Sequence, residues 1–551
     1  MKHLKSWLPF LLAGGTMVLM YALYGFYLED AERFGASVLY GGICAPPVSD
    51  NWFFDPWLFH VPILARLSTA FETVPVLGVW HIITQFLYLT LWYHLALRVL
   101  NRNGKQNLLI VIPVSCLLVV ALMGTSLVYF YNLRDAILLT TACLLLYFDY
   151  NQHDGRKPVH FLLIFLLGCL LRLPGAILSL TAITVLFFLY YRNVKTLFHF
   201  LKLPWLMVIV LAMLVKGHEL VVNNPGMKIE QGYEYALTDR GAVLPVSVMT
   251  TTEDTMRYRA LTEYFLISDS AQINIDFIAR VVDNNKYLSL GITQSDFAHL
   301  LKKSLPVVRK YKELILLFYL LLLIAGYNRS GTFFTVILFN IFCWLIVLVI
   351  GMKLSMYNYF LAPWLAITFG ASLYFLFIQK PFNFMQKTGV LIVLTILLGY
   401  ETKGCQEISY QETAYNKMAF TYLEKLDTLS LQATPVLWGF EELYLPTALF
   451  SRTESSVLKK CIFQNMFFLN YYRFGQERAL QKFGFSPLDW RSMNLGFKQN
   501  NDKICFVLDD RFAAFLGQYY NTIYGLDFTL VKDIPEKEIY PGNFVYHLDE
   551  K

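Results

Sequence analysis

Long apolar segments recur through this chain and are separated by short polar loops. A transmembrane helix needs about 20 predominantly apolar residues. Charged residues make up only 16% of the sequence, whereas soluble domains carry roughly 25%. The sequence therefore predicts an all-α polytopic membrane domain of about eleven transmembrane helices, at residues 7–26, 77–99, 107–129, 135–149, 159–171, 175–191, 203–217, 313–327, 331–352, 357–378 and 388–400.

Two of these segments need an interpretation. The first follows Lys2 and Lys5 and resembles a signal peptide, but it is long and lacks a small-residue cleavage site, so we predict an uncleaved helix. The stretch 159–191 is too long for one straight span, and Arg172-Leu173-Pro174-Gly175 interrupts it. We predict two short helices joined by a tight turn, because Pro and Gly break helices.

The distribution of basic residues predicts the orientation. Lys and Arg are more frequent in the loops that lie on the N-terminal side of the membrane than in the short loops on the other side. Because cytoplasmic loops retain positive charge, we expect a cytoplasmic N-terminus and an external C-terminus in the plasma (inner) membrane. The same bias accounts for the net charge of +6, and the sequence has no nucleic-acid-binding motif.

The predicted domain organisation follows from this topology. Residues 1–400 form the membrane domain, with large external loops at 27–76 and 218–312. Residues 401–551 form an external soluble domain, which we expect to be α/β or α+β because it contains β-like runs at 504–508 and 544–546. A Cys461–Cys505 disulfide is possible there, and no Cys/His spacing indicates a metal site.

The first external loop carries a dense polar cluster where it leaves the membrane. If it is helical, Glu29 and Asp30 share faces with Arg33. One interpretation is a solvated helix end, and the other is a carboxylate base beside an arginine that faces a lipid-borne phosphate. Later in the loop, Asp55 and His60 lie in an aromatic stretch typical of a membrane-interface anchor.

Two further external loops carry charges. Arg134 and Asp135 begin the helix at 135–149, where an acidic residue is also favourable through the helix dipole. Arg172 lies in the predicted turn between two short helices. With the first loop, these residues come from three loops on one side of the membrane, and this convergence favours a functional site.

In their order along the chain, these motifs resemble the GT-C fold glycosyltransferases that use polyprenyl-phosphate-linked sugars, especially relatives of protein O-mannosyltransferases and lipid A aminoarabinose transferases. Asp30-Ala31-Glu32-Arg33-Phe34 is similar to the family's Asp-x-x-Arg-Tyr motif, with Phe in place of Tyr. The shorter matches are Phe54-Asp55-Pro56-Trp57-Leu58, Asp135-Ala136-Ile137-Leu138-Leu139, Arg172 with Gly175, and Tyr357-Asn358-Tyr359-Phe360-Leu361-Ala362-Pro363. The resemblance covers 1–217 in loop order and a stretch near 357–370.

The resemblance implies transfer of a sugar from a polyprenyl-phosphate donor to a glycan, lipid or protein acceptor on the outer face. It makes Asp30 the general base, with no cofactor or metal. The family's relatives usually have a donor-facing lysine where this chain has Asp55, so the phosphate contact passes to Arg134, Arg172 or Lys353. The implied site residues are Asp30, the supporting cations Arg33, Arg134, Arg172 and Lys353, and the pocket candidates Glu29, Asp55, His60, Asp135 and Tyr357.

Other functions remain open from the sequence. A transporter or flippase of lipid-linked sugars would also be polytopic, but transporters tend to show repeated halves and charges near the midplane, and no internal repeat is visible here. A polysaccharide polymerase or ligase and a non-catalytic scaffold are further alternatives.

The predicted topology can be tested with a reporter fused after Lys551. An odd number of spans should make a periplasmic-type reporter active and a cytoplasmic-type reporter inactive in the same cells. The opposite pattern would place both termini on one side and remove the common-face argument.

Overall fold

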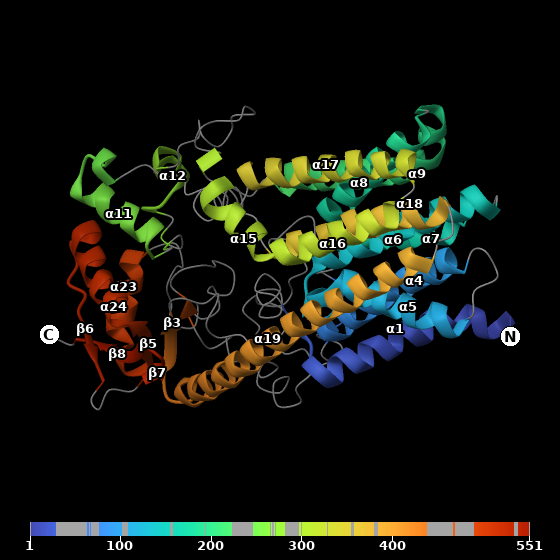
Figure 1. Cartoon of the computed structure of the whole chain (residues 1–551). Helices are drawn as coiled ribbons and strands as arrows, with labels where there is room; N and C mark the ends of the chain where they lie inside the picture. The colour runs from blue at the N-terminus through green and yellow to red at the C-terminus, as the bar shows by residue number, and fades with distance from the viewer. Residues whose placement is uncertain are drawn as a thin grey trace.

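The computed structural model describes most of the chain and places its two ends far apart (Figure 1). The described residues are 2–28, 63–64, 67, 76–101, 108–154, 158–192, 194–222, 246–264, 266, 269, 271–281, 297–298, 300–327, 329–353, 358–379, 384–437, 467–468, 490–533 and 538–549. They form a bundle of long helices and a smaller, strand-containing domain near the C-terminus.

The helical bundle accounts for every predicted apolar segment. Its helices are α1 (Lys2–Tyr24), α4 (Val76–Leu100), α5 (Leu108–Met123), α6 (Asn132–Asp154), α7 (Val159–Leu171), α8 (Leu173–Tyr191), α9 (Val194–Val222), α16 (Lys312–Gly326), α17 (Ser330–Lys353), α18 (Asn358–Gln379) and α19 (Phe384–Ser430). Within the described ranges, seven helices are long and apolar enough to cross a membrane, in α1, α5, α8, α9, α17, α18 and α19. The chain is therefore a polytopic helical membrane protein, and the full count of eleven spans stays a prediction.

The predicted break between α7 and α8 is present. Arg172 adopts an extended backbone (φ −158°, ψ 98°) between the two helices, and Pro174 lies in the first turn of α8. Gly175 approaches α6 so closely that a Cβ there would lie 3.0 Å from the carbonyl oxygen of Leu133. The turn is therefore packed directly against the first turn of α6.

Helix α6 is the centre of the bundle. Every residue from 134 to 149 is buried, and α6 packs against α4, α7, α8 and α18. A helix with no exposed face needs neighbours on all sides. Its position therefore organises the surrounding helices.

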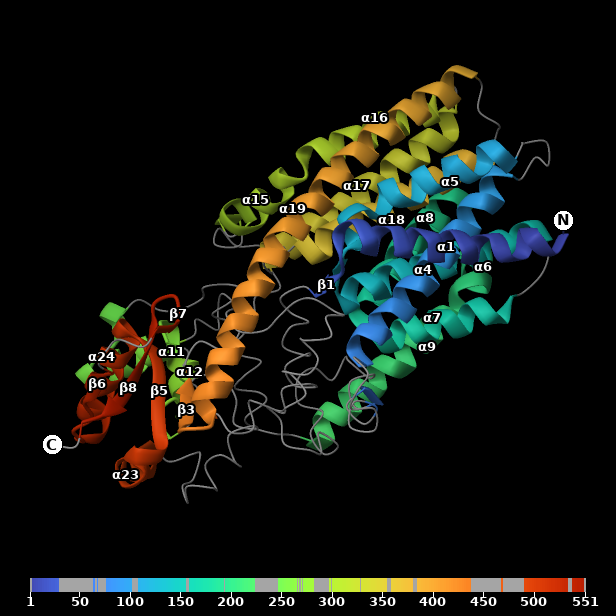
Figure 2. The ribbon, with the colours of Figure 1, turned by 90° about the horizontal axis from the view of Figure 1, so that it is seen from below.

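The bundle has two distinguishable ends. We call the end at which α19 leaves towards the C-terminal domain the outer end, and the end at which α1 begins the inner end (Figures 1 and 2). Helix α19 does not stop near residue 400, as the sequence interpretation assumed, but continues to Ser430. The strand-containing fold therefore begins about thirty residues later than predicted, because the polar continuation contains no proline and its single glycine, Gly404, does not end the helix.

Short backbone contacts connect the outer-end elements. Strand β1 (Tyr27–Leu28) pairs in parallel with β2 (Tyr129–Phe130), next to the 3₁₀ turn Gly124–Leu127. Glu401 of α19 accepts a hydrogen bond from the Thr125 amide at 2.9 Å. Gly124 has φ +45°, and any Cβ there would overlap the Glu401 carboxylate. These contacts fix α19 where it leaves the bundle.

The C-terminal domain contains a mixed sheet of strand order β4-β3-β5-β8-β6, with β7 also paired to β8. Strand β3 runs parallel to β4 and β5, whereas β8 runs antiparallel to β5, β6 and β7. The predicted runs at 504–508 and 544–546 are strands. The elements are β3 (Thr434–Leu437), β4 (Phe467–Phe468), α23 (Trp490–Gln499), β5 (Ile504–Asp509), α24 (Asp510–Tyr519), the π-helical turn Tyr520–Tyr524, β6 (Leu530–Lys532), β7 (Glu538–Tyr540) and β8 (Asn543–Leu548).

The core of this domain includes part of the 218–312 loop. Helices α11 (Thr252–Thr262) and α12 (Ile275–Val281) supply buried residues to one hydrophobic cluster with α23, α24 and the sheet. Figure 1 shows α11 and α12 beside α24. After this excursion, the π-helical turn Leu300–Ser304 and α15 (Leu305–Lys310) return the chain to the bundle. Two segments far apart in sequence thus form one domain, which we call the C-terminal domain.

A buried carboxylate joins these two segments. Asp269 is completely buried, and its Oδ2 accepts hydrogen bonds from the hydroxyls of Tyr519 and Tyr524, each at 2.7 Å. Burial raises the pKa of Asp269 above its ordinary value. Removal of the carboxylate from water penalises its charged form more than the two hydroxyl donors stabilise it.

This raised pKa predicts a pH dependence of stability. Because the folded-state pKa of Asp269 lies above the unfolded value, its stabilising contribution is complete at low pH and is lost as pH rises through the folded pKa. The full-length Asp269→Asn variant should therefore gain thermal stability relative to the parent as pH increases. Melting curves recorded as pH rises through the folded-state pKa of Asp269 test this expectation, with the exposed Asp276→Asn as control. A stability difference between variant and parent that does not change with pH would contradict it.

Candidate functional site

A buried charged cluster lies at the outer end of α6, around Asp135. This carboxylate is completely inaccessible, in the first turn of the helix. Arg134 donates to its Oδ1 from Nη2 at 2.8 Å and from Nε at 3.1 Å. On the other side, His81 Nδ1 lies 3.2 Å from Oδ2, and the Thr84 hydroxyl donates to Oδ2 at 3.3 Å. Both carboxylate oxygens therefore have partners.

The partners from α4 are positioned by helical spacing. His81, Thr84 and Gln85 are three and four residues apart and so share a face of α4. That face meets α6 and the neighbouring 3₁₀ turn, where Gln85 donates to the Leu127 carbonyl at 2.9 Å. Three polar residues on one face of a membrane helix were a signal in the sequence. His81 was not predicted as a site residue, because the 77–99 segment has the composition of an apolar span.

Aromatic rings enclose the ion pair. The Phe130 ring lies 5.4 Å from the Arg134 guanidinium carbon and 5.6 Å from the His81 ring, and Phe26 packs edge-on against Phe130. Arg134 itself is only 3% exposed. A charge in such surroundings is tolerated only when it is paired and hydrogen-bonded. The Arg134–Asp135 pair is therefore a buried ion pair, and not only an acidic residue placed favourably at the start of a helix.

The structure brings two of the predicted loops together. The Arg172 turn lies against the first turn of α6 through the Gly175–Leu133 approach, and Arg172 is partly buried. Arg134, Asp135 and Arg172 thus belong to adjoining backbone segments at the outer end. This packing brings the two segments side by side, and their predicted position on the outer face of the membrane stays a prediction.

The first loop reaches the same place but is described only at its start. Strand β1 ends at Leu28, which is paired with Phe130 beside the Arg134–Asp135 pair. Several predicted site residues lie outside the described residues: Glu29, Asp30, Arg33, Asp55, His60 and Tyr357. Lys353 ends α17, and its side chain is likewise outside the description. Their proposed roles stay predictions, as does the Cys461–Cys505 pairing, because Cys461 is also outside.

A second charged cluster, which was not predicted from the sequence, lies at the inner end of α6. Asp149, only 2% exposed, pairs with Arg98 of α4 and accepts a hydrogen bond from the Tyr374 hydroxyl of α18 at 2.9 Å. The Arg98 guanidinium also stacks on the Tyr150 ring at 3.8 Å. This cluster connects α4, α6 and α18 and pairs the buried Asp149 carboxylate with a cation. A structural role in holding the three helices together therefore explains it.

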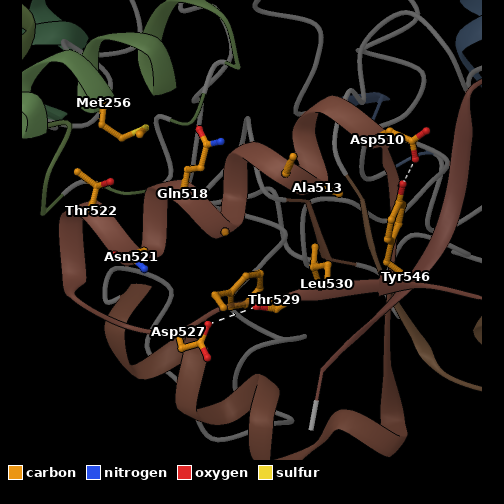
Figure 3. Close-up of a pocket in the computed structure, with 13 residues that line it drawn as sticks. Met256, Asp510, Ala513, Gln518, Asn521, Thr522, Asp527, Thr529, Leu530 and Tyr546 are labelled. Carbon is orange, nitrogen blue, oxygen red and sulfur yellow. Dashed lines mark hydrogen bonds between the residues drawn. The ribbon is translucent and has the colours of Figure 1, made fainter. Parts of the chain in front are cut away.

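The C-terminal domain contains a groove of about 660 Å³ between α24 and the β6–β8 edge (Figure 3). Apolar atoms of Leu530 and Ala513 alternate along it with polar side chains. The polar lining residues are Asp510, Gln518, Asn521, Thr522, Asp527, Thr529 and Tyr546. Gly517 forms part of the lining, and a Cβ there would lie 2.8 Å from the Phe528 carbonyl oxygen.

The groove is lined by amides, hydroxyls and two carboxylates. The Asp510 carboxylate accepts a hydrogen bond from the Tyr546 hydroxyl and forms an ion pair with Lys532 Nζ at 2.9 Å. These contacts lower the pKa of Asp510. Asp527 accepts a hydrogen bond from Thr529 at 3.3 Å. Among the residues that the structure describes, no Lys, Arg or His lines the groove. Amides and hydroxyls offer both donors and acceptors, so the groove suits an uncharged polar ligand better than a phosphate.

Neither a metal centre within the described residues nor a similarity to known proteins gives further evidence of function. Among the residues that the structure describes, no group of three or more His, Cys, Asp or Glu side chains is placed to hold a metal ion. Comparison of the chain with protein-family models, curated proteins and solved structures gives no match.

The importance of the Asp135 pairing can be measured directly. Asp135→Leu leaves Arg134 buried without its carboxylate, which typically costs about 3–5 kcal/mol. We expect the unfolding midpoint of the purified protein to fall by several degrees. The double variant Arg134→Leu/Asp135→Leu should recover part of the loss, because it removes both charges.

The matched control is Asp502→Leu, at an exposed position of the C-terminal domain. Its midpoint should stay close to that of the parent protein. An Asp135→Leu variant as stable as this control would show that the pair does not stabilise the bundle.

Proposed function

We propose that this protein is a GT-C-type membrane glycosyltransferase that moves a sugar from a polyprenyl-phosphate donor to an acceptor at the outer face. The observation that carries the proposal is the meeting of three loops at the outer end of α6. Leu28 of β1 pairs beside the Arg134–Asp135 pair, and the Arg172 turn packs against the same helical turn. Asp30 follows Leu28 by two residues in the sequence.

The proposed reaction uses one carboxylate as the base and several cations to stabilise the leaving group. The acceptor oxygen or nitrogen attacks the anomeric carbon, while the bond from that carbon to the phosphate oxygen breaks. The acceptor proton passes to the Asp30 carboxylate, and the bonding electrons remain on the departing polyprenyl phosphate. Preorganised cations stabilise the phosphate because its charge grows as the bond breaks. The proposed contributors are Arg33, Arg134, Arg172 and Lys353.

Asp135 has a positioning role in this proposal. Its carboxylate fixes the Nε and Nη2 edge of Arg134, so the guanidinium is held in one orientation without solvent. A fixed cation stabilises developing charge without reorganisation during the reaction. His81 and Thr84 hold the other carboxylate oxygen and so limit rotation of Asp135.

The membrane arrangement belongs to the proposal as well. Eleven spans with an internal N-terminus place the outer end of the bundle, the C-terminal domain and the lipid-linked donor on the external side of the plasma (inner) membrane. The direction of α1 and the exit of α19 at opposite ends support the odd number (Figure 1). The polar groove of the C-terminal domain, which lacks a lining cation among the described residues, suits the proposed recognition of an uncharged acceptor.

A transporter or flippase of lipid-linked sugars remains the alternative. Charges that handle a substrate in transporters tend to lie near the bilayer midplane. On α6, the two buried carboxylates instead lie near its ends, at Asp135 and Asp149. This distribution favours chemistry at one membrane face over passage through the bundle.

The proposed general base can be tested by Asp30→Asn. The amide keeps the size and can still accept a hydrogen bond at a helix start, but it cannot take the acceptor proton. Loss of a general base typically lowers the rate about 10²–10⁴-fold. Sugar incorporation into the acceptor fraction of membranes, normalised to the amount of inserted protein, should fall by that factor.

Glu29→Gln and Glu32→Gln are the matched controls, since each removes one neighbouring negative charge. Both should keep most of the activity. Full activity in Asp30→Asn would refute its role as base, and equal losses in all three variants would indicate a general effect of local charge.

A further inference from the structure

A basic segment connects the C-terminal domain to the bundle at residues 300–312. It comprises the π-helical turn Leu300–Ser304, α15 and the first residues before and in α16. The Ser304 hydroxyl donates to the Gly351 carbonyl at 2.9 Å, in the last turns of α17. A Cβ at Gly351 would lie 3.0 Å from Leu300 Cδ1. The basic segment is therefore packed against the outer end of one membrane helix and leads directly into another.

The cations of this segment have no protein partners in the described structure. They are all exposed and none forms an ion pair or side-chain hydrogen bond there: Lys302, Lys303, Arg309, Lys310 and Lys312. Glu313 is the adjoining acidic residue in the sequence. Lys and Arg are usually retained on the cytoplasmic side of membrane proteins. A cluster of them at the outer end, where α19 also leaves, is therefore unexpected unless it binds something.

Apolar side chains accompany these cations. Val307, Val308 and Tyr311 pack against the bundle core. Leu301 and Leu305 point away from it, with 47% and 46% of their surfaces exposed. A short segment with exposed leucines among lysines and arginines has the composition of a membrane-interface segment. Its leucines can enter the headgroup region while the longer basic side chains remain beside the phosphates.

We propose that residues 300–312 form a binding surface for the phosphate headgroups of anionic bilayer lipids. The charge is complementary, the segment lies where membrane helices α16 and α17 end, and its exposed leucines match an apolar boundary. Lipid phosphates are the partners that a bilayer supplies at this level. The surface is independent of the proposed glycosyl transfer, because none of its residues belongs to the Asp135 cluster.

The test uses the full-length protein in nanodiscs of phosphatidylcholine with or without phosphatidylglycerol. The parent protein should retain phosphatidylglycerol preferentially after mild detergent extraction, as measured by mass spectrometry of bound lipid. The variant Lys302→Gln/Lys303→Gln/Arg309→Gln/Lys310→Gln should lose this preference by roughly tenfold or more, because each cation near an anionic surface contributes. High salt should weaken retention in the parent protein, as screening requires.

The matched control makes the same change in charge on other exposed cations: Lys417→Gln/Lys498→Gln/Lys503→Gln/Arg511→Gln. It should retain phosphatidylglycerol like the parent protein. The charge-conserving variant Lys302→Arg/Lys303→Arg/Arg309→Lys/Lys310→Arg should do the same, which separates loss of charge from misfolding.

Two outcomes would overturn the proposal. In the first, the glutamine variant of the basic segment keeps the preference for phosphatidylglycerol, or the control variant loses that preference to the same extent. The other is a glutamine variant that retains phosphatidylglycerol but no longer retains polyprenyl phosphate added to phosphatidylcholine discs, which would assign the surface to the lipid-linked donor.

Discussion

The requirement that buried charge be paired organises this protein, and helix α6 is where it acts. From 134 to 149 the helix is buried on all sides, yet it carries carboxylates near both ends. Asp135 is paired with Arg134 and held by His81, whereas Asp149 is paired with Arg98 and held by Tyr374. In an apolar environment neither carboxylate can remain charged without these partners. Helices α4 and α18 are therefore bound to α6 by polar contacts as well as by packing.

The same pairing gives the outer end its chemical character. The Arg134–Asp135 pair lies where β1 ends, where the Arg172 turn meets α6 and where α19 is fixed through Glu401 and Thr125. Helix α19 then extends to the C-terminal domain, which also includes α11 and α12 from the long loop. The proposed transfer reaction needs fixed cations, a base and an acceptor-binding domain at one membrane face. The described elements place a fixed cation, Arg134, at the end of the bundle from which α19 leaves towards the C-terminal domain.

The sequence predicted what depends on local pattern. Apolar runs mark the helices because a bilayer demands them, and Arg172-Leu173-Pro174-Gly175 marks a break because proline and glycine end helices. Patterns of this kind do not reveal long-range contacts. The His81–Asp135 contact joins residues fifty-four positions apart, and Asp269 meets Tyr519 only after two segments pack together. The length of α19 was missed for a different reason: its polar half is ordinary helical sequence, which hydropathy does not distinguish from a loop.

The central claim, that this protein consumes a polyprenyl-phosphate-linked sugar at the outer membrane face, is tested most directly by the lipids of cells that lack it. Mass spectrometry of the polyprenyl-linked pool should reveal one lipid-linked sugar that accumulates, and enzymatic access to intact cells or spheroplasts should place it on the outer leaflet. Accumulation on the inner leaflet would instead indicate a flippase. An unchanged lipid-linked sugar pool would contradict the account.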